Sequence, residues 1–301
     1  DMELWIFATL IAASLQTARF MLQKVLSRSQ LSTAGATYSR FCYSAPILWI
    51  GVIGYFWSND LPVPVLSGLF WCYASLGGLA QILATVCVVA LFRSRNFAVG
   101  ISFKKTEVIQ SVLVGILLLG EGVSLNGFSA ILIGLLGVLL LSDQSKKGQT
   151  SSKRFLNRAT GLGVSSGFLF AISAVAYRGA TLQVDTGTPI STAAVTLLMV
   201  VSLQMIAMTA WIYFREPNQL VAVWNARKTA IWIGLTSMGG SLAWFTAFSL
   251  QNAAYVKALG QFELLLSLMA SHLIFKEQIS KRELGGLFLL TASILSLVFL
   301  L

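Results

Sequence analysis

Long apolar runs recur along the whole chain and are separated by short polar breaks. A helix needs about 20 mostly apolar residues to cross about 30 Å of hydrocarbon, and ten such runs can be found. The sequence therefore predicts an all-α membrane protein with ten transmembrane helices. The runs cover residues 4–24, 33–57, 65–92, 96–119, 123–142, 160–183, 190–214, 229–250, 253–275 and 283–301.

The composition agrees with a membrane protein because it leaves few charges for a surface in water. Apolar residue types make up 56% of the chain and charged types 11%, against about 25% charged residues in ordinary globular proteins. The segment before the first run lacks a basic region, so we expect this run to remain as a helix and not to be a cleaved signal.

Several enzyme classes lack the residues that their chemistry needs. His272 is the sole histidine of the sequence, and Cys42, Cys72 and Cys87 lie inside apolar runs, so neither a two-imidazole site nor a disulfide framework is indicated. No phosphate-binding loop, Ser/His pair or Asp dyad is present. We expect no enzyme activity, no catalytic residue, no metal and no cofactor.

The loop charges predict how the chain lies in the membrane. Alternate loops hold fifteen basic residues, whereas the other loops hold none and carry Asp60, Glu121 and Asp185. Cytoplasmic loops concentrate lysine and arginine, so we predict a multi-pass protein of the inner (plasma) membrane with both termini non-cytoplasmic. The net charge of +10 then needs no nucleic-acid partner. The basic loop residues are Lys24, Arg28, Arg93, Arg95, Lys146, Lys147, Lys153, Arg154, Arg158, Arg215, Arg227, Lys228, Lys276, Lys281 and Arg282.

The two halves of the chain repeat one another. Residues 1–142 and 159–301 would each hold five helices, joined by a cytoplasmic linker at 143–158. Five is an odd number, so the second repeat must be inverted relative to the first, a plan that recurs in secondary transporters. Asn96, Glu107 and Glu121 match Asn252, Glu263 and Glu277 at an offset of 156, and Ser14, Arg19 and Ser32 match Ser173, Arg178 and Ser191 at an offset of 159.

Two matching segments carry a family resemblance. Thr106-Glu107-Val108 with Leu118-Leu119-Gly120-Glu121, and Phe262-Glu263-Leu264 with Phe275-Lys276-Glu277, resemble the repeat unit of the EamA-type transporters of the drug/metabolite transporter superfamily. The resemblance implies a ten-helix transporter. Val108 and Leu264 stand where the family usually has a proline, and relatives are usually described with cytoplasmic termini, opposite to the orientation that the charges predict.

Charged residues inside the spans mark candidate site residues, because charges at bilayer depth normally face a partner or a wet cavity. The excess of six basic over two acidic residues, +4, favours a substrate with a carboxylate, phosphate or sulfonate group. The acidic residues are Glu107 and Glu263, and the basic residues are Arg19, Arg40, Lys104, Lys105, Arg178 and Lys257.

These charges allow more than one interpretation. Arg19 and Arg40 lie near the cytoplasmic ends of their spans, where they could extend to the surface. Lys104 shares a helix face with Glu107, but Lys105 lies on another face. Lys105 and Lys257, with Gln261 one turn deeper than Lys257, are the preferred substrate-binding residues, because neither lysine has an acidic residue three or four positions away. Alternatively, Glu107 and Glu263 pair with Arg19 and Arg178 as structural struts.

Aromatic and amide side chains at depth could frame an organic substrate. Tyr177, Trp244 and Phe20, with Gln16 and Gln81 as hydrogen-bonding groups, are the candidates, and plain packing is the alternative. Other tryptophans lie nearer span ends and are expected to be interfacial anchors. These are Trp5, Trp49, Trp57, Trp211 and Trp232.

Taken together, these features predict a secondary transporter that moves a small organic metabolite by alternating access. An amino acid or an organic anion is the expected substrate and export the expected direction. The alternative is a lipid or lipid-linked sugar flippase on the same fold, for which a lateral opening between helices would be required. Expected partners are membrane lipid and the small-molecule substrate, without an ATPase subunit, and the protein is expected to be a monomer or homodimer.

Overall fold

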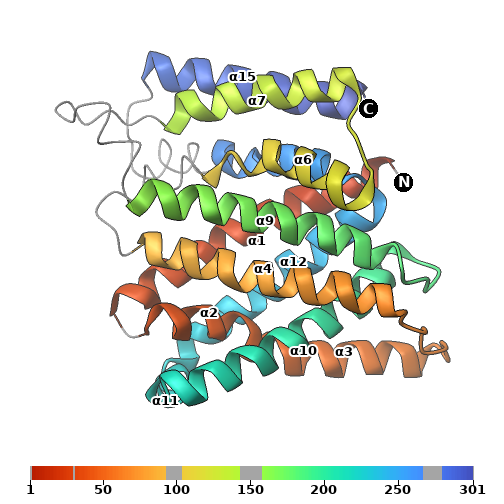
Figure 1. Cartoon of the computed structure of the whole chain (residues 1–301), viewed down its shortest axis with the longest axis vertical. Coiled ribbons are helices and arrows are strands. Elements are labelled where there is room, and N and C mark those ends of the chain that lie inside the picture. The colour runs from red at the N-terminus through yellow and green to blue at the C-terminus, as the bar shows by residue number, and fades with distance from the viewer. Residues whose placement is uncertain (1, 30, 93–103, 143–157, 267–279, 301) are drawn as a thin grey trace.

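Helices that run roughly side by side make up the fold (Figure 1). The computed structural model describes residues 2–29, 31–92, 104–142, 158–266 and 280–300, and no strand occurs among them. The first half contains α1 (Met2–Ser29), α2 (Thr33–Cys42), α3 (Ser44–Ser58), α4 (Gly68–Phe92), α6 (Glu107–Leu119) and α7 (Leu125–Ser142). The second half contains α9 (Arg158–Thr181), α10 (Pro189–Arg215), α11 (Asn218–Asn225), α12 (Arg227–Leu250), α13 (Ala253–Leu259) and α15 (Lys281–Leu300).

Seven segments within the described ranges are long and apolar enough to cross a membrane. The shorter helices α6 and α7 are also apolar. Parts of the predicted spans 96–119 and 253–275 lie outside the described residues, so the predicted total of ten spans stays a prediction. The seven segments are Glu3–Gln23, Thr33–Ser58, Gly68–Leu91, Thr160–Thr181, Pro189–Arg215, Arg227–Leu250 and Lys281–Phe299.

Local sequence signals explain where several helices begin and end. The Ser32 hydroxyl accepts a hydrogen bond from the Gly35 backbone N–H and caps α2, as is usual for a serine at this position. Pro189 begins α10, where its missing N–H has no cost. Gly120 ends α6 in the left-handed region at φ 66°, and Asp60 follows α3 at φ 49°.

The backbone breaks just before each of the two in-span glutamates. Residues 105–106 form a turn directly ahead of Glu107, and residues 260–261 form a turn two positions ahead of Glu263. The breaks therefore occur although Val108 and Leu264 replace the family's proline. Tyr43 similarly interrupts the predicted second span, which consists of α2 and α3.

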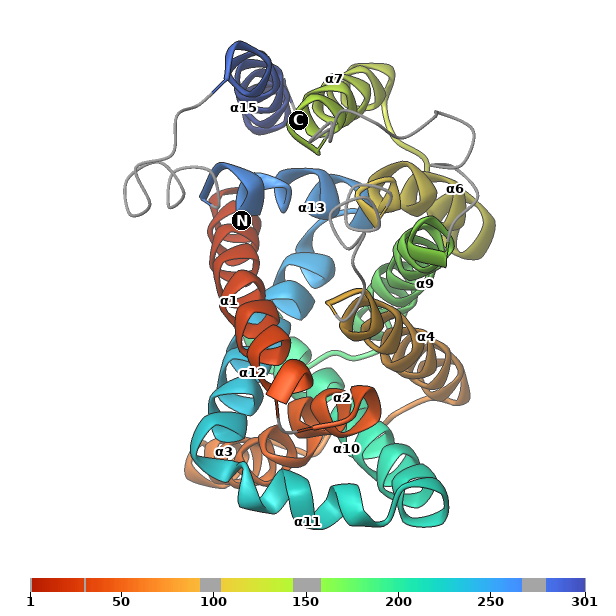
Figure 2. The same cartoon turned by 90° about the vertical axis from the view of Figure 1, so that its left-hand side faces the viewer.

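Helices from the two halves pack against one another in a reciprocal pattern. α1 packs along α12, α4 packs along α9, and α7 packs along α15. An end-on view places α1 and α12 on one side and α4 and α9 on the other (Figure 2). Between α7 and α15 the backbones come close at Gly137 and Gly286, where a methyl group on either would lie 2.8 Å from the other's carbonyl oxygen. Small residues are typical of such contacts in membranes.

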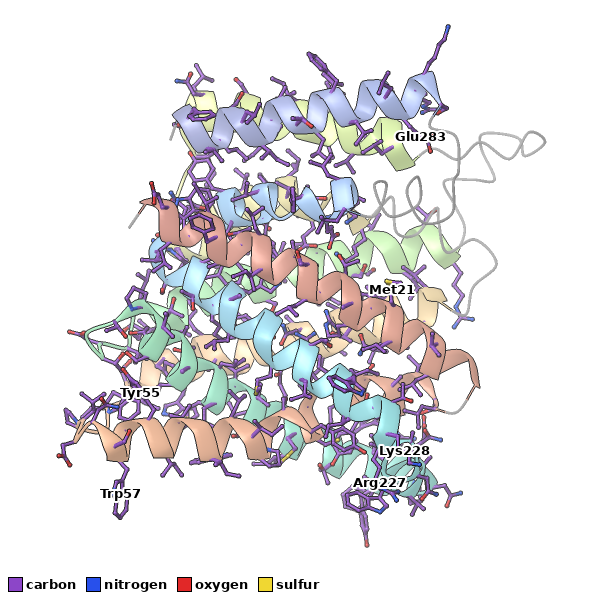
Figure 3. The ribbon with its side chains drawn as sticks, turned by 180° about the vertical axis from the view of Figure 1, so that it is seen from behind. Met21, Tyr55, Trp57, Arg227, Lys228 and Glu283 are labelled. Atoms are coloured by element: carbon purple, nitrogen blue, oxygen red, sulfur yellow. The ribbon has the colours of Figure 1, made fainter. Side chains whose placement is uncertain are left out.

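The two ends of the helix bundle differ in their exposed side chains. Figure 3 shows Tyr55 and Trp57 at one end and Arg227 and Lys228 at the other. Trp57 is 83% exposed, as expected of an interfacial anchor, and Trp49, Trp211 and Trp232 are also exposed. Trp5 is not an anchor of this kind, because it is 3% exposed within the core. Both chain ends lie at the same end of the bundle (Figure 1).

Candidate functional site

A small cavity lined by polar and aromatic side chains lies between helices of both halves. Its volume is about 20 Å³, which is enough for about one water molecule. The candidate residues Gln16, Gln81, Tyr177, Trp244 and Lys257 line it. The other lining residues are Arg40, Phe170, Ser173, Ala174, Ser241, Phe245 and Phe248.

Arg40 of α2 lies in this cavity and does not extend to the surface, so the prediction that it reaches the membrane boundary is wrong. It is 4% exposed. Its Nε donates to Ser237 Oγ at 2.7 Å, Nη1 to Thr85 Oγ1 at 3.1 Å and Nη2 to Ser241 Oγ at 3.2 Å. Thr85 belongs to α4 and both serines to α12, so these two helices hold the guanidinium.

An amide and phenol network forms another wall of the cavity. The Tyr177 hydroxyl donates to Gln81 Oε1 at 2.8 Å. Gln204 Nε2 donates to the same oxygen at 2.9 Å and to the Gly78 carbonyl at 3.0 Å. These bonds hold Tyr177 against the ring of Phe245, with centroids 4.3 Å apart. The network links α4 of the first half with α9 and α10 of the second.

Trp244 of α12 forms the aromatic side of the cavity. Its ring stacks on Phe248 with centroids 5.8 Å apart, and Lys257 Nζ lies 4.5 Å from the ring centroid. The indole Nε1 is buried and has no hydrogen-bond partner in the described part of the chain. The benzo edge of the indole contacts the position where a side chain on Gly260 would lie, so only a glycine fits there.

Lysine and glutamate side chains form ion pairs beside the cavity, both within the first half and between the halves. Lys257 Nζ lies 2.7 Å from Glu107 Oε1, and Lys104 Nζ lies 3.0 Å from Glu107 Oε2. Lys105 pairs with Glu263, whose other oxygen accepts from Gln16 Nε2 at 3.1 Å. All three lysines are at most 8% exposed. Lys105 and Lys257 have no acidic residue three or four positions away in the sequence, and each instead pairs with a glutamate of the other half.

The two remaining in-span arginines lie outside the cavity. Arg19 is 2% exposed and so does not extend to the surface either. It donates to Gln23 Oε1 at 2.8 Å and lies 4.2 Å from the ring centroid of Phe20. Arg178 pairs with Glu121 at 2.9 Å and donates to the Phe248 carbonyl at 2.7 Å. The strut alternative is therefore wrong in giving Arg178 an in-span glutamate as its partner.

Lys105 and Gln261 lie together in a second, smaller cavity of about 10 Å³. Its other walls come from α6, α7, α13 and α15 and are mostly apolar, with Ser293 as a further polar residue. The structure therefore separates these two candidates from the central cavity, and Phe20 also does not line it.

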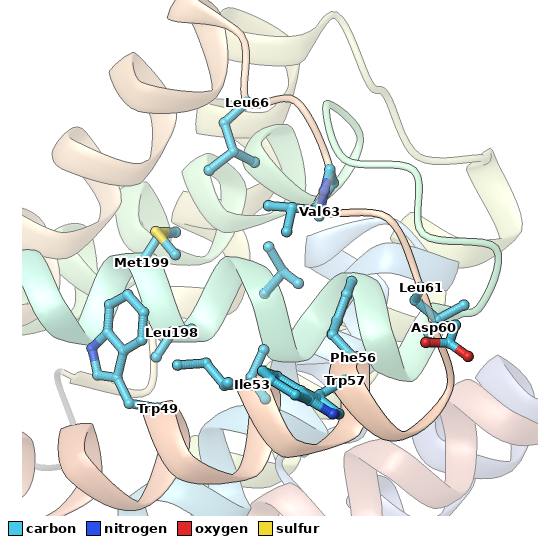
Figure 4. A pocket seen from close by; sticks show the side chains of 13 residues that line it. Trp49, Ile53, Phe56, Trp57, Asp60, Leu61, Val63, Leu66, Leu198 and Met199 are labelled. Carbon is cyan, nitrogen blue, oxygen red and sulfur yellow. The ribbon is translucent and has the colours of Figure 1, made fainter.

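A much larger groove lies on the outside of the bundle. It has a volume of about 540 Å³ and lies between α3, the segment 59–67 and α10 (Figure 4). Trp49, Trp57 and Val63 line it, and Asp60 is its one charged lining residue. Trp57 and Val63 are largely exposed, so this groove presents an apolar surface, whereas the polar groups gather in the central cavity.

Sequence reasoning missed the importance of Arg40 and of its hydroxyl partners. One signal was present, because Ser237 and Ser241 are four residues apart and so share one face of an otherwise apolar helix. Thr85 gave no comparable signal, since threonine hydroxyls in apolar helices usually bond to the carbonyl one turn back, as Thr85 also does with Gln81.

Two comparisons with known proteins found a similarity to this chain. Residues 158–299 match the model of the EamA-like transporter family. A solved structure described only as the crystal structure of a protein is similar over 98% of this chain and 99% of its own, with a TM-score of 0.65 and 15% sequence identity. No curated protein matches the chain. The structural similarity shows a shared fold over the full length.

Proposed function

We propose that the chain is a secondary transporter of the drug/metabolite transporter superfamily that moves a small organic metabolite across the inner (plasma) membrane, because residues 158–299 match the model of the EamA-like transporter family. The observation that carries the proposal is the central cavity, whose polar side chains come from both halves. Arg40 and Gln81 belong to the first half, and Tyr177, Trp244 and Lys257 belong to the second.

Alternating access between two inverted five-helix repeats is the proposed mechanism. The reciprocal packing supports it, because exchanging the two repeats converts the α4–α9 contact into the α12–α1 contact and maps the α7–α15 contact onto itself. The helix breaks at 105–106 and 260–261 lie at nearly equivalent positions of the repeats. Discontinuous helices next to a central site recur in secondary transporters.

The ion pairs between the two halves are the contacts that would rearrange as the protein alternates between its two access states. Lys257 with Glu107 and Lys105 with Glu263 each join one repeat to the other near the breaks. If one repeat rocks against the other, these pairs must shift together. In the proposed cycle these pairs hold the closed state and rearrange when the cavity opens.

The proposed substrate carries an acidic group, so an amino acid or an organic anion is the substrate class. Three buried lysines share two carboxylates beside the cavity, and Arg40 adds another cation. An anionic group would offset this excess, since uncompensated cations at depth are unfavourable. Export is the proposed direction, and both termini are proposed to lie outside the cytoplasm.

A lipid flippase would need a polar path that opens sideways to the lipid. The polar side chains lie instead in a cavity of about 20 Å³ between helices, and the groove that is open on the outside is lined almost entirely by apolar residues. This arrangement favours a soluble metabolite over a lipid headgroup as the transported molecule.

Two measurements on the full chain test the proposal. The protein purified in detergent is screened against a metabolite library by thermal shift, where a ligand at a hundred times its Kd stabilises by about 2.7 kcal/mol. The strongest binder is then used in counterflow with proteoliposomes, against protein-free liposomes. Saturable counterflow supports the proposal. Lipid scrambling without solute counterflow would overturn it in favour of the flippase.

A further inference from the structure

The buried cations around the central cavity differ in how they are neutralised. Lys104, Lys105 and Lys257 each have a carboxylate within ion-pair distance. Arg40 has three hydroxyl partners, on Thr85, Ser237 and Ser241, and no carboxylate of the described residues pairs with it. Its guanidinium is thus a full charge held by neutral groups.

Neutral hydroxyls orient a guanidinium without cancelling its charge. The three hydroxyls come from α4 and α12, so the side chain is fixed from two sides of the bundle. Each of the three nitrogens uses one bond, and Nη1 and Nη2 each have a second N–H. A planar fork of this kind matches a carboxylate in a two-bond geometry.

A second donor in the same cavity lacks a partner. Trp244 is 8% exposed and lines the cavity with Arg40. Its Nε1 is buried and unbonded within the described ranges, although buried indole N–H groups usually find a partner. Because the benzo edge of the indole faces Gly260, the N–H edge lies on the opposite side of the ring.

The rest of the cavity wall carries no negative charge that could neutralise a cation. Its remaining polar side chains, Gln16, Gln81, Ser173 and Tyr177, are neutral, and Phe170, Ala174, Phe245 and Phe248 are apolar. Glu107 and Glu263 are engaged with lysines, so neither presents a free carboxylate for an ammonium group. The cavity therefore fits an anionic head with an apolar body and does not fit the ammonium of an amino acid.

Resting on the proposed transport function, we propose that Arg40, with Trp244 as a second donor, recognises the carboxylate of an apolar organic monocarboxylate that carries no ammonium group. The lysines beside the cavity then serve as partners of Glu107 and Glu263 and do not bind the substrate directly. The cavity, with a volume of about 20 Å³, must widen to admit such a molecule.

Binding to the full chain in detergent, measured by thermal shift and calorimetry, tests the assignment. The probes share a benzene ring and differ in charge: phenylpropanoate is an anion, L-phenylalanine a zwitterion and phenylethylamine a cation. Hexanoate replaces the ring with an alkyl chain. We expect both carboxylates to bind, and L-phenylalanine to bind at least tenfold more weakly than phenylpropanoate, a difference of about 1.4 kcal/mol.

Variants then locate the carboxylate. Arg40→Gln should weaken phenylpropanoate binding tenfold or more, Arg40→Lys should restore part of it, and Arg215→Gln, an exposed arginine at the end of α10, should leave it unchanged. Trp244→Phe keeps the ring and removes the N–H, so its loss should be smaller and should affect carboxylates only.

Unchanged phenylpropanoate binding in Arg40→Gln overturns the assignment, as does equal or stronger binding of L-phenylalanine or phenylethylamine by the unmodified protein. The latter comparison needs no variant, so it decides the question even if Arg40→Gln does not fold. Wild-type counterflow of another metabolite, without carboxylate binding, would overturn this inference and leave the proposed transport function intact. Absence of any counterflow would count against that function instead.

Discussion

Lys257 of the second half lies with its Nζ 2.7 Å from Oε1 of Glu107, which belongs to the first half. The two residues are 150 positions apart in the sequence, and neither would be tolerated alone at this depth. The pair shows how the two halves depend on each other, because a cation in one is neutralised by a carboxylate in the other. Lys105 and Glu263 repeat the arrangement with the roles of the halves exchanged.

Removing the Glu107 carboxylate should strongly destabilise the protein. Glu107→Gln leaves both Lys104 and Lys257 without their carboxylate partner, and breaking a buried pair costs about 3–5 kcal/mol. Lys257→Gln should cost less, since Lys104 still pairs with Glu107. Thermal unfolding of the purified variants in detergent measures both effects.

The double variant Glu107→Gln with Lys257→Gln provides the control for this prediction. It should be more stable than the sum of the single changes implies, with a coupling of about 0.5–3 kcal/mol. Additive changes would mean that the two side chains do not interact.

The Arg178–Glu121 pair should contribute less and should depend on salt. Its side chains are 14% and 26% exposed, so the surrounding solvent and ions screen it more than the buried pairs. We expect Arg178→Gln to lower stability by about 1 kcal/mol at low ionic strength and by less at high ionic strength. Melting curves at two sodium chloride concentrations test this, and Glu107→Gln should show no such dependence.

Close packing of α7 on α15 predicts a sharp difference between glycines. A methyl group on Gly137 would lie 2.8 Å from the Gly286 carbonyl oxygen and 2.8 Å from the Leu290 backbone nitrogen. Gly137→Ala must therefore move the helices apart, at about 1–3 kcal/mol. Gly51 of α3 has open space around it, so Gly51→Ala should be neutral or stabilising by up to about 1 kcal/mol. Equal melting temperatures for the two variants would contradict the packing.

The proposed orientation predicts which positions are accessible from outside the cell. In a variant without native cysteines, Asp60→Cys should react with a membrane-impermeant thiol reagent in intact cells. Lys228→Cys, at the opposite end of the bundle from the α3 end that carries Tyr55 and Trp57 (Figure 3), should react only after permeabilisation. Reaction of Lys228→Cys alone in intact cells would reverse the orientation.

The sequence alone determined the class of the fold and the residue types at depth. Apolar run length decides membrane insertion, and this property is local, so the apolar segments could be located without a structure. Lys104 and Glu107 pair, as their spacing of three residues indicated, although a turn at residues 105–106 separates them. The helix breaks before Glu107 and Glu263 were not predictable from proline, since Val108 and Leu264 occupy those positions.

Only the tertiary structure decided which buried charged side chains pair with one another. The sequence allowed the Arg40 side chain to extend to the surface and does not show that it is buried against Ser237 and Ser241 of α12. Likewise, Lys105 and Lys257 look unpaired along their own helices, yet each meets a glutamate of the other half. Pairing at bilayer depth depends on how distant helices face one another, and local spacing carries no information about that.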